Sequence, residues 1–260
     1  GYDMARLHVG GLGTLGIITE VSFKLTPLPA KQGSLSVNFN SRSAAYDFSR
    51  NIFNSYAMPL ALSIVDVSLS EMDEIPPDNA SVIVRLGGRD KAFERQVKII
   101  SDIASKFDIG NVELLNSRLS ATTWNEIRDF GWLDPKIETI LNVSSSPVDT
   151  KVVEDVIREV LGPSEIKYNV VSQPGFGVLY GYLGVVSGED NRWRRIVTEI
   201  RDKCGKVGAD VGLEKVPSDK KKEIDVWPQV EPRVLKLMQD LKETYDPVGI
   251  LNKGRFIGRI

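Results

Sequence analysis

The sequence has one cysteine, one histidine and no long apolar run. Cys204 is the only cysteine, so the chain has no internal disulfide and no metal site built from cysteines, which suits a reducing compartment. With His8 as the only histidine, a metal centre made of clustered histidines is excluded. The longest uncharged run, residues 168–188, contains five glycines and a proline. That composition is typical of strands and a turn, so no transmembrane segment is predicted.

The chain also lacks an excess of charge of either sign. Its 260 residues include 33 Lys and Arg and 35 Asp and Glu, which gives a formal net charge of -2 and a pI near 5.7. No basic stripe interrupts this balance, so binding to nucleic acid is not predicted. Hydrophobic residues make up 42% of the chain, as in an ordinary globular protein with a sizeable core.

Four glycines stand among the seven residues from Gly10 to Gly16. Glycine adopts positive φ at little steric cost and lets another group approach the backbone closely. Residues 17–25 then alternate apolar and polar, which predicts a strand with one buried face. The glycine spacing satisfies G-x-G-x-x-G, but it precedes a strand where the dinucleotide-binding fingerprint opens a helix, and no Gly-Lys-Ser/Thr follows it as in a phosphate-binding P-loop.

Two similar series of strands and helices follow. In the first, the periodicity predicts strands at 34–39, 60–67, 80–86 and 112–115 with helices at 41–56 and 90–107, and a linking helix at 117–130 comes next. In the second, it predicts strands at 137–143, 166–171, 177–186 and 209–216 with helices at 146–161 and 191–203.

Each series has the order β-α-β-β-α-β. We therefore predict an α+β fold of duplicated ferredoxin-like units, forming one large antiparallel sheet of about eight strands with helices on one face. A last amphipathic helix is expected at 230–245, with Val234, Leu237, Met238 and Leu241 facing inward and Pro247 ending it.

Both ends of the chain resemble one protein family. Gly1-Tyr2-Asp3, Arg6-Leu7 and residues 10–29 are similar to the end of the flavin-binding domain in FAD-linked oxidases of the vanillyl-alcohol oxidase, or PCMH, type. Residues 246–256 resemble the closing motif of that family, D-P-x-G-x-x-N-P-G-[KR], with Lys253 where proline is usual.

The resemblance implies three regions. Residues 1–29 would end the FAD-binding domain, residues 30–230 would form a substrate or cap domain with units at about 33–116 and 137–216, and residues 231–260 would return to the flavin domain. The chain would then be the C-terminal part of such an oxidase. With the upstream half of the flavin domain outside it, residues 1–260 are expected to bind FAD poorly by themselves.

The resemblance also implies a cofactor, FAD, and the residues that hold it. Neighbouring amides in a glycine turn make a concavity suited to anions. The cofactor-binding residues expected from the family are Gly10, Gly11, Gly13, Thr14, Leu15, Gly16, Ile18 and Asn252. An alternative is that Asn252 and Gly254 merely shape a C-terminal turn.

Two arginines are candidate substrate anchors. The family places Arg255 near the isoalloxazine or the substrate carboxylate, which the planar guanidinium matches with two parallel hydrogen bonds. Arg128, between two tryptophans, is the second candidate. Four aromatic residues could line a pocket, although core packing explains them more readily: Trp124, Trp132, Tyr180 and Tyr182.

The catalytic residues are not identified. Relatives that oxidise 2-hydroxy acids carry a motif H-x-G-D-G-N-x-H, whereas the matching residues 173–180 contain no histidine and no acid. A lone histidine is more often packed or exposed than catalytic, so His8 is not assigned a role. No general base for the hydroxyl proton follows from the sequence.

The functional hypothesis is an FAD-dependent oxidoreductase subunit that oxidises a small 2-hydroxy acid such as glycolate by hydride transfer to flavin. Many family members have Ser-Glu where this chain has Gly11-Leu12, a variation similar to that in the smaller flavin-binding subunits of glycolate oxidases. That likeness implies partners, namely a larger flavin subunit and an iron–sulfur subunit, and a cytoplasmic location, peripheral to the membrane through those partners. Two alternatives are a non-catalytic assembly or binding module and a family oxidase acting on another alcohol or a sugar.

Overall fold

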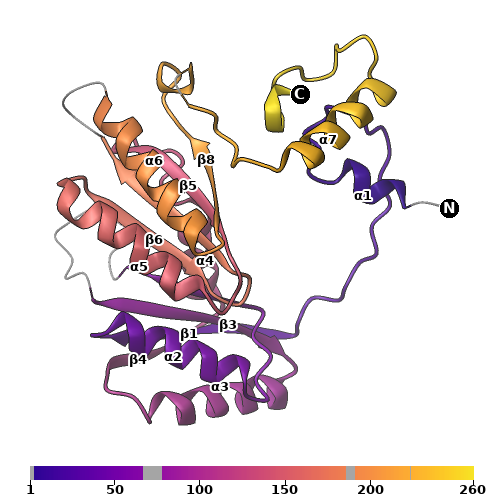
Figure 1. The fold of residues 1–260 in the computed structure, drawn as a ribbon. Coiled ribbons are helices and arrows are strands. Elements are labelled where there is room, and N and C mark those ends of the chain that lie inside the picture. Colours follow the sequence, from indigo (N-terminus) through magenta and orange to yellow (C-terminus); the bar gives the residue numbers. More distant parts are fainter. Residues whose placement is uncertain (1–2, 67–77, 186–190, 223) are drawn as a thin grey trace. The chain divides into compact units, whose positions relative to one another are not determined.

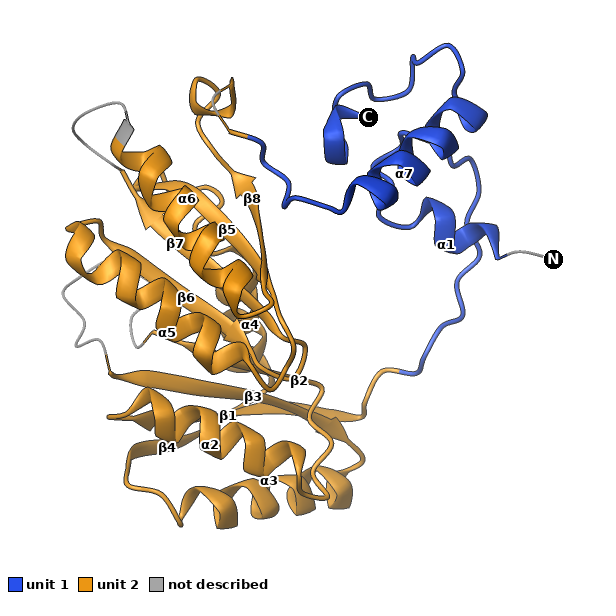
Figure 2. Cartoon of the chain, in the orientation of Figure 1, with its two compact units in different colours: residues 1–27, 225–260 blue, residues 28–224 orange. Residues whose placement is uncertain are grey.

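The computed structural model describes residues 3–66, 78–185, 191–222 and 224–260. The chain divides into two compact units, shown in Figure 2. We call residues 28–224 the sheet unit and residues 1–27 with 225–260 the terminal unit. Because both ends of the chain belong to the terminal unit, the glycine loop and the closing motif lie in the same compact body.

The sheet unit contains one eight-stranded sheet, visible in Figure 1, with the strand order β4-β1-β3-β2-β6-β7-β5-β8. All of its strand pairs are antiparallel. The strands are β1 (Lys31–Phe39), β2 (Ala61–Val65), β3 (Ala80–Gly88), β4 (Ile109–Leu115), β5 (Ile137–Ser144), β6 (Tyr168–Gln173), β7 (Val178–Gly184) and β8 (Asp210–Lys215).

The strand order confirms the predicted duplication. In each half the first strand lies between the fourth and the third, and the second strand follows the third, as in a ferredoxin-like unit. The two halves join where β2 pairs with β6, with Ile64 opposite Ser172 and Val65 opposite Val171. One α+β fold with a single large antiparallel sheet results, as expected.

The helices of the sheet unit also follow the prediction. They are α2 (Arg42–Phe53), α3 (Asp90–Ala104), α4 (Ser117–Asp129), α5 (Thr150–Leu161) and α6 (Asn191–Lys206), with short 3-10 turns at Gly162–Ser164 and Lys220–Lys222. Ser41 caps α2 by accepting a hydrogen bond from the Ala44 amide at 3.4 Å. The helix predicted to begin at Ser146 instead begins at Thr150, because residues 147–149 form a turn.

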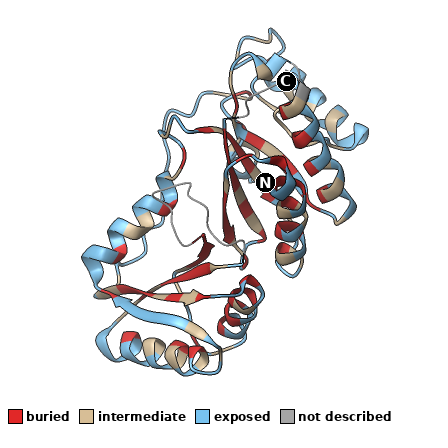
Figure 3. Ribbon diagram, turned by 90° about the vertical axis from the view of Figure 1, so that its left-hand side faces the viewer, coloured by how far each residue is buried: buried red, intermediate tan, exposed pale blue. Residues whose placement is uncertain are grey.

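One face of the sheet carries α2, α3, α5 and α6. Leu35, Val37 and Phe39 alternate along β1 and are fully buried with side chains of α2 and α3. The second half packs on the same face, since the Tyr46 hydroxyl of α2 donates to Glu154 of α5 and accepts a hydrogen bond from the Ser172 hydroxyl of β6. Figure 3 shows that burial is concentrated on the strands and on the helix sides that face them.

Helix α4 covers the opposite face of the sheet. Ser34, one position out of phase with Leu35, bonds to Ser120 of α4 at 2.6 Å and accepts from Trp124 Nε1 at 2.9 Å. A second apolar cluster lies on this side, formed by Val65, Ile83, Ile127, Ile137, Ile140, Val171 and Tyr182. The linking helix is therefore not a spacer, because it covers part of the face that the four other helices leave open.

The terminal unit contains α1 (Met4–His8), α7 (Pro232–Tyr245) and a 3-10 turn at Ile257–Arg259. The strand predicted for residues 17–25 is wrong for this structure, which assigns these residues no secondary structure. A strand needs a neighbouring strand, and the described residues provide no partner here, so Phe23 and Leu25 are 79% and 87% exposed. The inward orientation predicted for Val234 and Leu237 is also wrong, because both are exposed while Leu235 packs at Gly258.

Candidate functional site

The glycine loop, residues 10–16, is held by a turn of its own. Gly10 and Gly13 have φ of 77° and 69°, and Leu12 between them has φ of 50°. Thr14 is buried and closes the turn, because its amide and its hydroxyl both donate to the Gly11 carbonyl at 2.9 and 2.7 Å. The left-handed backbone explains the glycines at positions 10 and 13.

The opposite end of the chain contacts this loop. Asn252 Nδ2 donates to the Leu12 carbonyl at 2.5 Å, and Lys242 Nζ of α7 donates to the Thr14 carbonyl at 2.8 Å. Lys242 also donates to the Leu251 carbonyl at 2.8 Å. The structure therefore brings Asn252 to the predicted glycine loop, across some 240 residues of sequence.

Asp246 organises the closing motif. Its carboxylate accepts hydrogen bonds from Lys242 Nζ and from the amides of Leu251 and Ile250, the latter two at 2.9 and 3.2 Å. The hydrogen bond from Lys242, helped by those amides, lowers the pKa of Asp246 to about 2. The carboxylate is thus ionised and fixes the turn that presents Asn252.

The other predicted cofactor residues lie on or beside the loop. Gly16 lies beside the ring of His8, where a Cβ would come 3.3 Å from Cε1. That ring packs edge-on against Tyr245, with centroids 6.3 Å apart, so His8 serves as a packing residue in the terminal unit. Leu15 is half-buried and Ile18 is 61% exposed.

The two candidate substrate anchors have different surroundings. Arg255 lies in the terminal unit, where its carbonyl accepts from Trp227 Nε1 at 3.3 Å and its side chain makes no ion pair with any residue that the structure describes. Arg128 lies in the sheet unit, exposed at the end of α4, and donates to both carboxylate oxygens of Asp129 at 2.7 and 2.6 Å. The two arginines thus belong to different compact units of the chain.

Three of the four candidate pocket aromatics, Trp124, Tyr180 and Tyr182, lie on the face of the sheet that α4 covers. Tyr182 is 3% exposed and packs edge-on against Phe130, with centroids 4.6 Å apart. Trp124 packs against the same cluster, and burial raises the pKa of Tyr180. Trp132 is 44% exposed. Three of the four are thus packed against one another or against α4, as the core interpretation predicts.

A buried cluster of charges between α2 and α5 was not indicated by any sequence pattern. Arg42 pairs with Asp66 and Glu154, and Arg158 donates to the same two carboxylates at 2.8 and 2.7 Å. The Tyr46 hydroxyl completes the cluster at Glu154. Burial acts to raise the pKa of Glu154, but Arg42 and Arg158 outweigh it, so the pKa is lowered and the group is ionised.

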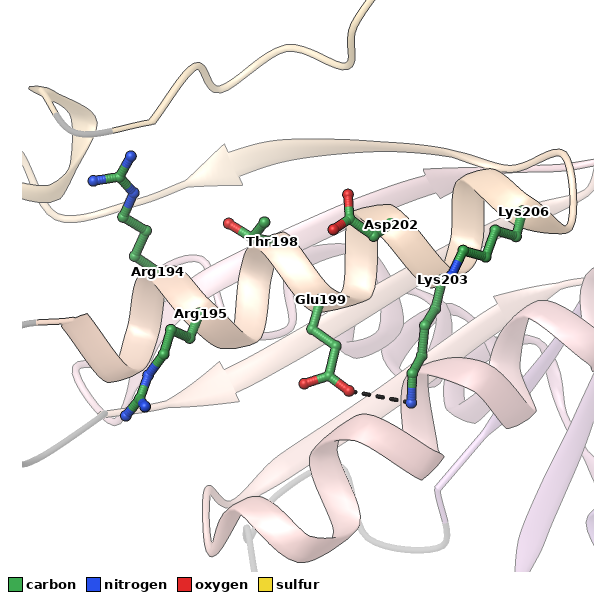
Figure 4. A pocket seen from close by; sticks show the side chains of 7 residues that line it. All are labelled: Arg194, Arg195, Thr198, Glu199, Asp202, Lys203 and Lys206. Atoms are coloured by element: carbon green, nitrogen blue, oxygen red, sulfur yellow. Dashed lines mark ion pairs between the residues drawn. The ribbon is translucent and has the colours of Figure 1, made fainter.

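A charged groove runs along the outer side of α6 (Figure 4). It has a volume of about 630 Å³ and is lined by Arg194, Arg195, Thr198, Glu199, Asp202, Lys203 and Lys206. Lys203 is paired with Glu199 at 3.1 Å and with Glu159 of α5 at 3.0 Å. The groove contains no predicted site residue, and it is a solvated helix face.

Two absences apply to the described part of the chain. Its His, Cys, Asp and Glu side chains form no group that could hold a metal ion. None of its helices is both long and apolar enough to cross a bilayer.

Comparison with known proteins gives one family. The family model described as FAD linked oxidases, C-terminal domain, matches residues 28–256. The chain is 25% identical over 279 residues to the glycolate oxidase subunit GlcD of Bacillus subtilis (strain 168), covering all of this chain and 58% of that protein. It is 22% identical to the mitochondrial D-lactate dehydrogenase [cytochrome] of Arabidopsis thaliana, covering 99% of this chain and 48% of that protein. The chain thus spans about half the length of the curated relatives it matches.

Solved structures agree on the fold. An alkyldihydroxyacetonephosphate synthase superposes with a TM-score of 0.63 at 18% identity, over 97% of this chain and 49% of that one. p-Cresol methylhydroxylase with substrate bound superposes with a TM-score of 0.63 at 16% identity, over 90% and 54%. At these identities the likeness shows a shared fold and nothing about substrate.

Proposed function

This chain belongs to the family of FAD linked oxidases, whose C-terminal domain matches residues 28–256, and on that premise we propose that it is part of an oxidoreductase that oxidises a small 2-hydroxy acid such as glycolate or lactate. FAD is the cofactor of the family. Two relatives support the substrate class, because glycolate and lactate, the acids in their names, are both 2-hydroxy acids.

The observation that carries the cofactor part of the proposal is the contact between the two ends of the chain. Asn252 and Lys242 hold the carbonyls of Leu12 and Thr14, so the glycine loop and the closing motif form one structure. The backbone at Gly10 is open to a ligand, because a Cβ added there would meet nothing within 4 Å. Residues 10–16 would hold FAD, with Asn252 maintaining the loop.

Bound FAD supplies the oxidising chemistry, by accepting hydride from the carbon that bears the hydroxyl. The protein contributes binding and orientation of the substrate. Arg255 is the anchor that we assign to the substrate carboxylate, because its side chain forms no ion pair within the described residues and its planar fork suits two parallel hydrogen bonds.

The test is an anaerobic substrate screen on the full-length protein. Glycolate, D-lactate and L-lactate are compared with p-cresol, benzyl alcohol and a hexose, and bleaching of the visible flavin absorption is recorded. The proposal predicts rapid bleaching by at least one 2-hydroxy acid and none by the phenol. Bleaching by the phenol, the alcohol or the sugar alone would assign the protein to another substrate class.

A second candidate, a flavin-holding assembly subunit without turnover of its own, is favoured by one observation. Residues 173–180, a tight turn and the start of β7, contain neither histidine nor acid to act as a base. Association with a larger flavin subunit and an iron–sulfur subunit would then supply the reaction. Failure of every substrate to bleach the flavin in the isolated protein, and bleaching in the complex recovered from cells, would favour this role.

A further inference from the structure

Lys242 contacts the glycine loop without being part of any motif. Its side chain is 13% exposed and its ammonium has three acceptors: the Thr14 carbonyl, the Leu251 carbonyl and the Asp246 carboxylate. An ammonium has three N–H donors, so all of them are used. Lys242 is therefore not free to contact a ligand itself, and its charge is already matched by Asp246.

These contacts fix which side of the loop the carbonyls face. Leu12 O points to Asn252 and Thr14 O points to Lys242. In a trans peptide the carbonyl of one residue and the amide of the next point in opposite directions. The amides of Gly13 and Leu15 therefore point away from Asn252 and Lys242, and neither finds an acceptor among the residues that the structure describes.

We propose that Lys242 is a positioning residue that turns the Leu15 amide toward the diphosphate of FAD, beside the Gly13 amide that Asn252 orients. The inference rests on the proposed function and deepens it by naming what shapes the site. Two neighbouring amides aimed to one side are a recurrent way of binding phosphate oxygens. Lys242 acts from behind the loop, through the Thr14 carbonyl, and it also holds the Leu251 carbonyl next to Asn252.

The same helix offers a matched control. Lys236 also lies on α7 and also pairs with an acid four residues later, Asp240, at 2.7 Å. Its side chain is 68% exposed, and it contacts no residue of the loop. Lys236→Met therefore removes the same charge and the same kind of ion pair, and leaves the loop carbonyls untouched.

The experiment measures FAD affinity of the full-length apoprotein by quenching of flavin fluorescence, for the wild type, Lys242→Met and Lys236→Met. Loss of three hydrogen bonds from a charged donor should weaken FAD binding about tenfold or more in Lys242→Met. Lys236→Met should bind within about twofold of the wild type, since exposed pairs contribute little. Lys242→Arg, which keeps a charged donor, should recover part of the affinity.

A second readout does not depend on any variant. Amide hydrogen exchange and chemical shifts of Gly13 and Leu15 are recorded by NMR in the wild-type apoprotein and with FAD. We expect exposed, fast-exchanging amides that become protected by FAD.

Unchanged FAD affinity in Lys242→Met, equal losses in both lysine variants, or no protection of the two amides would each overturn the positioning role and leave the proposed function standing. A wild-type protein that does not bind FAD would overturn both.

Discussion

Arg255 and Arg128 are the same residue type in opposite situations. Asp129 already engages the guanidinium of Arg128 with two hydrogen bonds. Arg255 has no such partner within the described residues. An arginine that is to bind a carboxylate must offer unoccupied donors, so the structure favours Arg255 as the substrate anchor.

We therefore predict that Arg255→Lys lowers kcat/KM for the 2-hydroxy acid by about 10- to 100-fold, because lysine cannot donate two parallel hydrogen bonds. Arg128→Lys, the comparison variant, should change it less than about threefold, as expected for an exposed ion pair. Steady-state kinetics on the full-length protein measure both. A larger loss in Arg128→Lys would exchange the two assignments.

Glu154 is the centre of the buried charges between α2 and α5. It is 1% exposed, forms ion pairs with Arg42 and Arg158, and accepts a hydrogen bond from Tyr46. Glu154→Gln removes one of the two carboxylates that balance the buried guanidinium groups of Arg42 and Arg158. We therefore expect the free energy of unfolding to fall by about 3–5 kcal/mol. Urea denaturation measures it.

Glu159→Gln, on the same helix, removes a carboxylate that is 69% exposed, and its effect should stay within about 0.5 kcal/mol. A difference between the two variants of less than about 1 kcal/mol would contradict the role given to Glu154.

The pKa of Asp246 makes the terminal unit sensitive to acid. An ordinary Asp titrates near 3.9, whereas Asp246 in the folded chain titrates at about 2. A carboxyl whose pKa is lowered by folding stabilises the folded state at pH values above the pKa that it has in the unfolded chain. This stabilisation is lost as the pH falls from about 4 to 2. Titration of the Asp246 carboxyl by ¹³C NMR should give this low value in the wild type and a higher one in Lys242→Met. An ordinary value in the wild type would contradict the network.

At the scale of single residues, the sequence predicts the features that depend on local conformation, such as the glycine loop and the helix cap at Ser41. Lys242 is not among them, because its spacing to Asp246 is repeated at Lys236–Asp240, Lys98–Asp102 and Lys151–Asp155. The pair of Lys242 with Asp246 differs from those three pairs only in the tertiary contacts of Lys242 with Thr14 and Leu251, which no local pattern encodes.

The turn between β6 and β7 is the element most constrained by its backbone. Gly177 has φ of 69°, and a Cβ there would lie 2.0 Å from the Ser145 carbonyl oxygen. Gly177→Ala should therefore lower the free energy of unfolding by about 1–3 kcal/mol.

Gly205 lies in α6, and a Cβ added to it would meet nothing within 4 Å, so Gly205→Ala should instead raise stability by about 0.5–1 kcal/mol. Thermal unfolding of the two variants tests the pair, and effects of the same sign would contradict the assignment.

The prediction of helices and strands succeeded where a segment has an apolar face and the sheet that buries this face lies within the chain. The strands and helices of both βαββαβ units follow from periodicity, because each buries one face against the sheet. Residues 17–25 show the same alternation and form no strand, since pairing requires a neighbour that the described residues lack. Helix α4 was predicted, but its position on the far face was not, because the contacts of Ser34 with Ser120 and Trp124 are not local.

At the scale of the whole molecule, the terminal unit carries the proposed cofactor site. Residues 1–27 and 225–260 form it together, so the FAD loop and the closing motif are shaped by one another. The sequence predicted this return only through resemblance to a family. Nothing in composition or spacing indicates that Asn252 donates to Leu12.

The most direct test of the central claim is the FAD content of the purified full-length protein, measured by visible absorption in the wild type, Gly13→Ala and Gly208→Ala. Gly13 and Gly208 have φ of 69° and 76°, so both variants impose similar backbone strain. A Cβ on Gly13 would come 3.0 Å from Asn252 Nδ2, whereas one on Gly208, in the sheet unit, meets nothing within 4 Å.

We predict stoichiometric FAD in the wild type and in Gly208→Ala, and loss of most of it in Gly13→Ala. A wild-type protein without FAD, or a Gly13→Ala variant that retains as much FAD as the wild type, would contradict the assignment of residues 10–16 to the cofactor.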